Sequence, residues 1–249
     1  AGSGHTRTVH RRPVGRAAST LTADARSLAR LFPAVLRAFG ERPHGLADLT
    51  VGKRRVFEFG SFIGGSAVAM LPSIIEAGGH LWCIDHFQGN PEDPATQYPE
   101  GVILAGFLHR TQAYRGYVTL IMGDTSEARH FPQGFADLVF IDAGHGYDQV
   151  KRYIEIALHL LGGQGIICGH DYIKHLEDCD PALVETHAMS PTGGHGGIGY
   201  GVIKAVNELL GRPNHRPDTA IWWVDLEARE PGGTPGGGFV GQHGIEVKS

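Results

Sequence analysis

Cysteine is scarce in this sequence, and long apolar runs are missing from it. Only 3 of the 249 residues are cysteine, an odd and sparse count that argues against a disulfide framework and predicts a reducing, cytoplasmic location. No apolar run approaches the roughly 18 residues that a membrane-spanning helix needs. The first residues have no secretory signal pattern, and we interpret 1–20 as a tail that includes a remnant of expression.

A strong charge of one sign is lacking as well. The chain has 22 Lys and Arg against 26 Asp and Glu, a formal net charge of -4. This balance provides no electrostatic attraction for nucleic acid or for an anionic membrane. The one basic run, at 7–16, is short and terminal and is interpreted as a solvated tail. The sequence therefore predicts neither nucleic acid nor a membrane as partner.

Apolar runs alternate with amphipathic stretches along the rest of the chain. Apolar runs predict strands at 55–59, 81–84, 117–122, 136–141, 165–168, 219–226 and 239–247. Helical spacing predicts helices at 21–39, 66–77, 101–114, 147–161 and 200–210. Continuously apolar strands separated by helices are typical of a parallel sheet covered on both faces. We expect one α/β domain over 21–249: a Rossmann-like, doubly wound, mostly parallel sheet of about seven strands, with helices on both faces.

Polar residues follow each of the first five predicted strands. They are Glu58 with Gly60, then Asp85, Asp124, Asp142, and finally His170 with Asp171. A single acidic residue after a strand is usually a helix cap. Because the carboxyl ends of parallel strands meet at one edge of a sheet, five in succession predict one shared ligand site.

The glycine-rich turn after the first strand indicates the kind of ligand. Its spacing, G-x-x-x-G-G from Gly60 to Gly65, matches neither the G-x-G-x-x-G dinucleotide pattern nor a P-loop. Glu58 would repel a pyrophosphate but suits a ligand with a positive amino group, such as S-adenosylmethionine. Asp85 is placed to accept ribose hydroxyls, and Asp124 with Thr125 to contact adenine. A turn without ligand, and helix capping by Asp85 or Asp124, remain open alternatives.

Two further stretches of the sequence indicate a protein family. With the glycine turn, residues 137–147 and 165–172 resemble class I S-adenosylmethionine-dependent methyltransferases, and are similar to methyltransferase family 24, a group close to antibiotic and sugar O-methyltransferases and to the cephalosporin hydroxylase group. Residues 201–208 resemble the late helix of that group, and the resemblance covers about 50–226. It implies O-methylation of a hydroxyl on a sugar or other secondary metabolite. The expected cofactor-binding residues are Glu58, Gly60, Ser61, Gly64, Ser66, Asp85, Asp124, Thr125, Asp142 and His145.

The resemblance also raises the question of a metal. Metal-dependent relatives carry an Asp after the fourth strand, which Asp142 matches, and an acidic pair after the fifth, where this chain has His170-Asp171. Mg²⁺ prefers oxygen ligands, whereas one His with two Asp suits Mn²⁺, Fe²⁺ or Zn²⁺ better. We expect Asp142, His170 and Asp171 to be the ligands of any divalent metal; otherwise His170 acts as a base.

Methylation of a hydroxyl requires that its proton be removed. The candidate catalytic residues are Asp142, which would hold a metal that lowers the pKa of the acceptor, and His145 or His170, either of which would take the proton. The alternative for His145 is a hydrogen bond to the backbone of its own glycine-flanked loop. The alternatives are metal-free N-methylation, a non-catalytic binding protein, and a nicotinamide-dependent oxidoreductase.

Two other segments suggest further features. The stretch 172–199 is rich in glycine and contains His175, His187 and His195, and we interpret it as a loop that acts as a substrate lid. The apolar face of the predicted 21–39 helix would allow a homo-oligomer. Of the pair Trp222-Trp223, one indole is expected in the core.

Overall fold

Seven strands form a single sheet in the computed structural model, which describes residues 45–90, 96 and 98–227. The strands are β1 (Arg55–Phe59), β2 (His80–Asp85), β3 (Val118–Met122), β4 (Leu138–Ile141), β5 (Ile166–Gly169), β6 (Asn214–Arg216) and β7 (Ile221–Asp225). Their order across the sheet is β3-β2-β1-β4-β5-β7-β6. The first five are mutually parallel, and β7 runs antiparallel to both β5 and β6.

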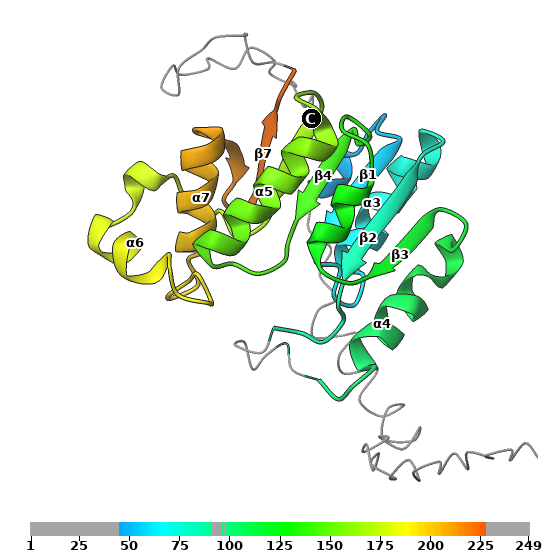
Figure 1. Ribbon diagram of the computed structural model, residues 1–249, viewed down its shortest axis with the longest axis horizontal. Helices are drawn as coiled ribbons and strands as arrows, with labels where there is room; N and C mark the ends of the chain where they lie inside the picture. Colours follow the sequence, from blue (N-terminus) through cyan, green and yellow to red (C-terminus); the bar gives the residue numbers. More distant parts are fainter. Residues whose placement is uncertain (1–44, 91–95, 97, 228–249) are drawn as a thin grey trace, which may run out of the picture.

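Helices cover the sheet on both sides (Figure 1). The helical segments are α2 (Leu46–Leu49), α3 (Gly65–Glu76), α4 (Val102–Thr111), η2 (Gln112–Tyr114), η3 (Thr125–His130), α5 (Tyr147–Leu161), η4 (Leu176–Asp178), α6 (Pro181–His187) and α7 (Tyr200–Leu210). One core lies between the sheet and α3 with α4, and the other between the sheet and α5 with α7. The resulting three-layer α/β fold confirms the predicted Rossmann-like sheet.

The alternation of side chains along each strand builds the two cores. In β4, Leu138 and Phe140 pack on the α3 side, whereas Val139 and Ile141 pack on the α5 side, as the period of two in a strand requires. All four are buried. A strand that is buried on both faces must be apolar throughout, which is why the central strands were recognisable in the sequence.

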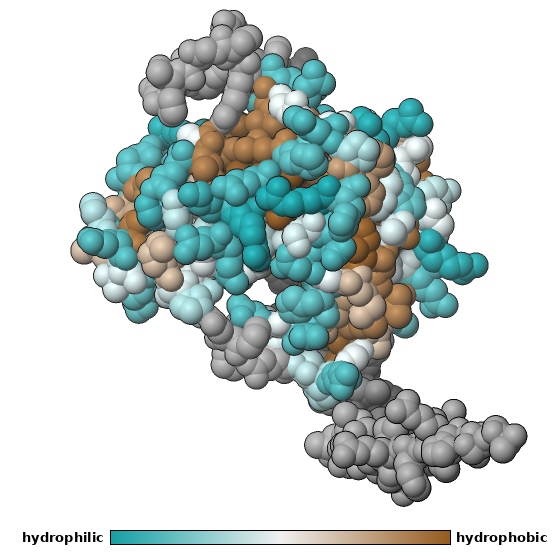
Figure 2. Space-filling model, in the orientation of Figure 1, coloured by the Kyte–Doolittle hydropathy of each residue, from teal (hydrophilic) through white to brown (hydrophobic). Residues whose placement is uncertain are grey.

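The surface in Figure 2 is largely hydrophilic, with apolar areas beside β7 and over β3 and α4. β3 is an edge strand, and its last residue, Met122, is 61% exposed.

The three cysteines are free and buried, and Trp222 is buried as expected. Within the described ranges, no helix combines the length and apolarity that crossing a bilayer demands.

The seventh strand of the described sheet is β6, which the sequence did not predict because it is only 3 residues long and polar. The predicted helix 21–39 and strand 239–247 lie outside the described residues. The stretch 172–199 is not one continuous loop: Asp180 accepts a hydrogen bond from the backbone N–H of Ala182 at 2.9 Å and so caps α6, with Pro181 in its first turn.

Candidate active site

The turn after β1 requires glycine at its first position. Gly60 has a positive φ of 84°, a conformation that costs little only for glycine. A Cβ atom on Gly60 would also come within 2.1 Å of the carbonyl oxygen of Asp142. The missing side chain therefore lets the loops after β1 and β4 meet at the carboxyl edge of the sheet. Gly64, with φ 80°, closes the turn and precedes α3.

Glu58 is completely buried beneath this turn. Its carboxylate accepts a hydrogen bond from the Ser66 hydroxyl at the start of α3 and another from the Cys83 thiol at 3.2 Å. Burial raises the pKa of Glu58 to about 7, although hydroxyl groups of the turn oppose the rise. None of the described residues forms an ion pair with it. A buried carboxylate without a cation is costly, so a positively charged ligand would fit here.

Asp85, at the end of β2, holds the turn in place. One carboxylate oxygen accepts hydrogen bonds from the backbone N–H groups of Ser61 and Phe62, each at 2.8 Å, and the other accepts from Phe87 at 2.6 Å. Oδ2 thus already accepts two hydrogen bonds, whereas Oδ1 accepts one and retains capacity for a further donor. Asp85 thus organises the glycine turn, and its contact with ribose hydroxyls stays a prediction.

Asp124 has the helix-capping role that the sequence left open. Its carboxylate accepts a hydrogen bond from the backbone N–H of Ser126 at 2.9 Å at the start of η3. Burial would raise the pKa of Asp124, but the hydrogen bonds from Ser126 and the charge of Arg152 lower it overall. The neighbouring Thr125 is buried, and its hydroxyl has no hydrogen-bond partner among the described residues. Thr125 is therefore the better placed of the two to bind a ligand.

Four titratable side chains form an acid–histidine cluster after β4 and β5: Asp142, His145, His170 and Asp171. Nε2 of His145 lies 2.9 Å from Oδ2 of Asp171, and Nδ1 of His170 lies 3.2 Å from Oδ1 of Asp171. Nδ1 of His170 is also 3.8 Å from Oδ1 of Asp142. Asp171 thus sits between the two imidazoles. The side chain of His145 therefore contacts a carboxylate that follows another strand.

The cluster shifts the pKa values of its members strongly. Burial lowers the pKa of His170, but the adjacent Asp171 and Asp142 outweigh it and raise the value to about 9. The pKa of His145 is likewise raised, since Asp171 outweighs burial. Against burial, both histidines hold the pKa of Asp171 far below its usual range. Burial raises the pKa of Asp142, with His170 opposing and Asp171 adding to the rise. A protonated His170 beside an ionised Asp171 is therefore the favoured state near neutral pH.

Glycines that follow α6 hold the backbone of His145 in place. Cβ atoms on Gly193 and Gly201 would come within 1.8 Å and 2.2 Å of the His145 carbonyl oxygen. The backbone N–H of Gly201 also donates to the carbonyl of Gly193 at 2.7 Å. The glycine-rich stretch that the sequence marked as a lid thus packs directly against the cluster.

Three cluster members can also hold a metal ion. One ligand atom from each of Asp142, His170 and Asp171 lies within 4.8 Å of the others. A small cavity of about 10 Å³ opens beside them, close to the size that one water molecule or ion occupies. Two carboxylates and an imidazole fit Mn²⁺, Fe²⁺ or Zn²⁺. The histidines of the 172–199 stretch make no comparable group within the described ranges; His187 and His195 instead stack at 4.3 Å between ring centroids.

Tyr172 and Asn207 support the backbone of Asp171 and were missed by sequence reasoning. Asp171 has a positive φ of 65°, which is strained for a residue other than glycine. Tyr172 next to it is buried, its N–H donates to the carbonyl of Ala220 at 3.0 Å, and its hydroxyl accepts from the Asn207 amide at 2.8 Å. The positions of residues 172 and 207 in the sequence do not predict this contact.

Comparison with known proteins identifies related chains. A family model described as a methyltransferase domain matches residues 57–172, which run from β1 to just beyond β5 and contain the whole acid–histidine cluster. No curated protein matches the chain.

Solved structures share the fold at low identity. An O-methyltransferase family protein from Burkholderia thailandensis has a TM-score of 0.53 at 16% identity, over 81% of this chain and 59% of its own. The chain thus spans little more than half of that protein. A Corynebacterium glutamicum protein has a TM-score of 0.52 at 16% identity, over 86% of this chain and 95% of its own. Cofactor-bound Rv0187 from MTB has a TM-score of 0.53 at 16% identity, over 85% and 94%.

Proposed function

We propose that this chain, whose residues 57–172 match a methyltransferase domain, transfers the methyl group of S-adenosylmethionine to a hydroxyl oxygen of a small molecule. The observation that carries the proposal is the acid–histidine cluster, which lies beside the glycine turn at the carboxyl edge of the sheet. Two residues join these parts, because Gly60 of the turn packs against the backbone of Asp142. The methyl donor and the group that deprotonates the acceptor would thus be neighbours.

The glycine turn is the proposed donor site. Glu58 fits the positive charge of S-adenosylmethionine because it is buried and has no cation among the described residues. The remaining contacts would come from the turn and from the ends of β2, β3 and β4: Gly60, Ser61, Gly64, Ser66, Asp85, Asp124, Thr125, Asp142 and His145. When bound, S-adenosylmethionine supplies an activated methyl group, so the protein chiefly has to align the acceptor with it.

The acid–histidine cluster is the proposed acceptor site. Asp171 orients both imidazoles, and one of them takes the proton of the acceptor hydroxyl. A histidine accepts a proton only when neutral, and the pKa of His170 is raised to about 9 by Asp171 and Asp142 despite burial. Turnover should therefore increase as the pH rises above neutrality.

A divalent metal would be held by Asp142, His170 and Asp171. When bound, it supplies Lewis acidity that lowers the pKa of an oxygen acceptor. His145 is not in this ligand set and would keep its contact with Asp171 as the proton acceptor.

The test is calorimetric titration of the protein with S-adenosylhomocysteine, with and without EDTA, followed by turnover assays with sugar and phenolic hydroxyl acceptors. We expect micromolar binding that Glu58→Ala weakens strongly. Methylation of an amine that persists in EDTA would instead favour N-methylation. Folded protein that binds no S-adenosylhomocysteine would overturn the proposal, and retained NADH fluorescence would point to an oxidoreductase.

A further inference from the structure

A second cavity opens at the amino ends of β1, β2 and β3, at the opposite edge of the sheet from the candidate active site. Its volume is about 700 Å³, within the range of small-molecule sites. Arg55 and His80, which line it, are the first paired residues of β1 and β2. Glu58 and Asp85 lie at the other ends of these strands, so methyl transfer gives this cavity no role.

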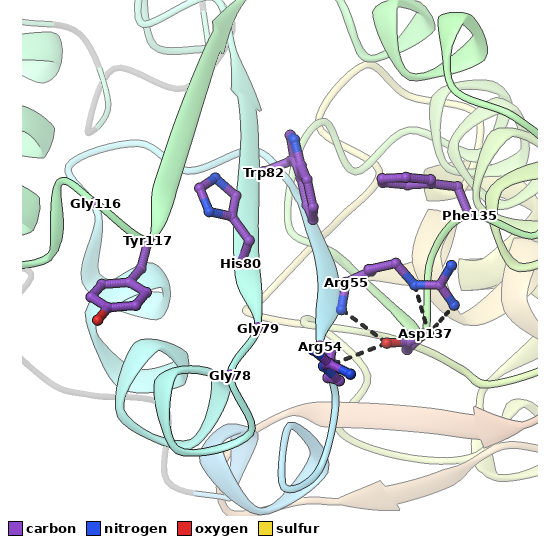
Figure 3. A pocket seen from close by; sticks show the side chains of 10 residues that line it. All are labelled: Arg54, Arg55, Gly78, Gly79, His80, Trp82, Gly116, Tyr117, Phe135 and Asp137. Atoms are coloured by element: carbon purple, nitrogen blue, oxygen red, sulfur yellow. Dashed lines mark hydrogen bonds and ion pairs between the residues drawn. The ribbon is translucent and has the colours of Figure 1, made fainter.

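Aromatic rings form the walls of the cavity (Figure 3). The Trp82 indole stacks on Phe57 with ring centroids 5.1 Å apart and planes at 12°, and it meets Phe135 edge to face at 5.3 Å. His80 lies 4.7 Å from the same indole. These contacts fix the indole, while Trp82 and Phe135 remain only half-buried. A flat ring could therefore bury further apolar surface against rings that are already in place.

Positive charge borders these rings. Arg55 donates from Nε and Nη2 to Oδ1 of Asp137 at 3.1 Å and 2.6 Å, and its Cζ lies 5.6 Å from the Phe135 centroid. A guanidinium has five N–H donors, so this arrangement leaves three for a ligand. The exposed Arg54 forms no side-chain ion pair with any described residue.

Asp137 is the one acidic residue in the lining, and both of its carboxylate oxygens already accept hydrogen bonds. Asp137 accepts from the guanidinium of Arg55 through Oδ1 and from the backbone N–H groups of Arg54 and Arg55 through Oδ2, each at 2.9 Å. These bonds anchor the base of the cavity (Figure 3). Two guanidinium groups against one carboxylate leave a positive charge uncompensated beside the rings.

We propose that this cavity binds a small molecule that combines a flat aromatic ring with a negatively charged group. The ring lies against Trp82 and Phe135, and the anion accepts hydrogen bonds from Arg54 and from the free N–H groups of Arg55. Carboxylate and phosphate share the planar or forked acceptor geometry that arginine recognises. The proposal is independent of methyl transfer.

The test is calorimetric titration of the full chain with 2-naphthyl phosphate, 2-naphthoate and the neutral 2-naphthylmethanol, all in excess S-adenosylhomocysteine. We expect at least one anion to bind about tenfold more tightly than the neutral compound, as a charge-assisted hydrogen bond implies. The anion that binds more tightly shows whether the cavity prefers a phosphate or a carboxylate. Equal affinity for the charged and neutral compounds would overturn the proposal.

Variants locate the binding. Arg54→Ala should weaken anion binding about tenfold, whereas Arg212→Ala, which removes an exposed arginine near β6, should leave it unchanged. Trp82→Leu should weaken binding, and Trp82→Phe should retain it because the aromatic wall is preserved. If Arg54→Ala and Trp82→Leu bind like the parent protein while their circular dichroism is unaltered, the anion binds elsewhere and the assignment is wrong.

Discussion

The side-chain amide of Asn207 donates a hydrogen bond to the Tyr172 hydroxyl at 2.8 Å, joining α7 to the residue that follows Asp171. The same amide donates to the carbonyl of Ile203 at 2.8 Å, so its orientation is fixed by α7. Tyr172 is buried, and Asp171 has a left-handed backbone. Strain of this kind persists only where the surroundings enforce it. We therefore expect Asn207 to position Asp171 between the two histidines, without touching the reacting groups.

Asn207→Leu should lower turnover while leaving the affinity for S-adenosylhomocysteine unchanged, because the proposed binding site of the methyl donor lies at the ends of β1 to β4. Loss of the buried hydrogen bond should also cost about 1–2 kcal/mol of unfolding free energy in urea. Tyr172→Phe removes the same bond from its other end. The effects of the two changes should therefore not add in the double variant, and additive losses would show that the two side chains act separately.

Ligand binding at Glu58 should depend on pH. Burial raises the pKa of this carboxyl from 4.5 to about 7, and a positively charged ligand would favour the ionised form. Affinity for S-adenosylhomocysteine should therefore increase as the pH rises from 6 to 8 and then level off. Glu58→Gln should bind weakly with little pH dependence. Calorimetry across this range is the measurement, and a parental pH profile in Glu58→Gln would exclude Glu58.

Ionisation of Glu58 should lower the stability of the unliganded protein as the pH rises, whereas it should raise the affinity for the ligand. Because the folded protein holds the Glu58 proton to higher pH than the unfolded chain, its unfolding free energy should fall as the pH rises from 4.5 to 7. The expected cost approaches about 3 kcal/mol for a rise of the pKa to about 7. Glu58→Gln should accordingly be more stable than the parent at pH 8 and gain less at pH 5. Urea unfolding at both values checks the sign.

Asp171→Asn should move the titration of His170 towards neutrality. Despite burial, Asp171 and Asp142 raise the pKa of His170 to about 9, and the variant removes the nearer carboxylate. In the parent, this ion pair stabilises the fold fully below the unfolded pKa of about 6.5 and ceases to do so as the pH rises through about 9. Histidine NMR titration in EDTA measures the change, with Asp148→Asn on the exposed start of α5 as control.

Gly60→Ala should destabilise the protein far more than Gly52→Ala. Both glycines have positive φ, 84° and 73°, but a Cβ on Gly60 would meet the Asp142 carbonyl at 2.1 Å and one on Gly52 would meet nothing within 4 Å. Gly52→Ala carries only the backbone strain, roughly 1–3 kcal/mol. The difference in urea-unfolding free energy isolates the steric term, and equal losses would contradict the close approach of the two loops.

Asp142→Asn should weaken Mn²⁺ binding at least tenfold in calorimetry, because it removes one of three anionic or imidazole ligands. Asp218→Asn, at the surface between β6 and β7, is the matched control. If the parent protein binds no Mn²⁺, Fe²⁺ or Zn²⁺, the cluster works through its histidines alone.

Much of this architecture was predictable because the central strands are buried on both faces. Such strands are continuously apolar, and each ends where a polar residue begins, so Glu58, Asp85, Asp142 and Asp171 could be assigned to one edge. The edge strand β6 lacks that signature. The start of α6 was signalled by Asp180-Pro181, but the glycines further on, at 193–199, led to an interpretation of the whole stretch as a loop.

Contacts between distant segments could not be predicted in the same way. The bond from Asn207 to Tyr172 depends on how α7 settles against the end of β5, and residue spacing contains no such information. Asp85 illustrates the same limit: its position was predictable, but its bonds to the backbone of Ser61 and Phe62 depend on the shape of the turn.

The placement of β7 has a consequence for how the protein is made. β7 pairs with β5 on one side and β6 on the other, and the Trp222 indole donates to the carbonyl of His170 at 3.2 Å. During synthesis, therefore, β5 has an open edge until residues 221–225 leave the ribosome, and open edges invite mispairing with other chains. The acid–histidine cluster gains its last support only when the final described strand arrives, so a chain interrupted shortly before Ile221 would be prone to aggregate.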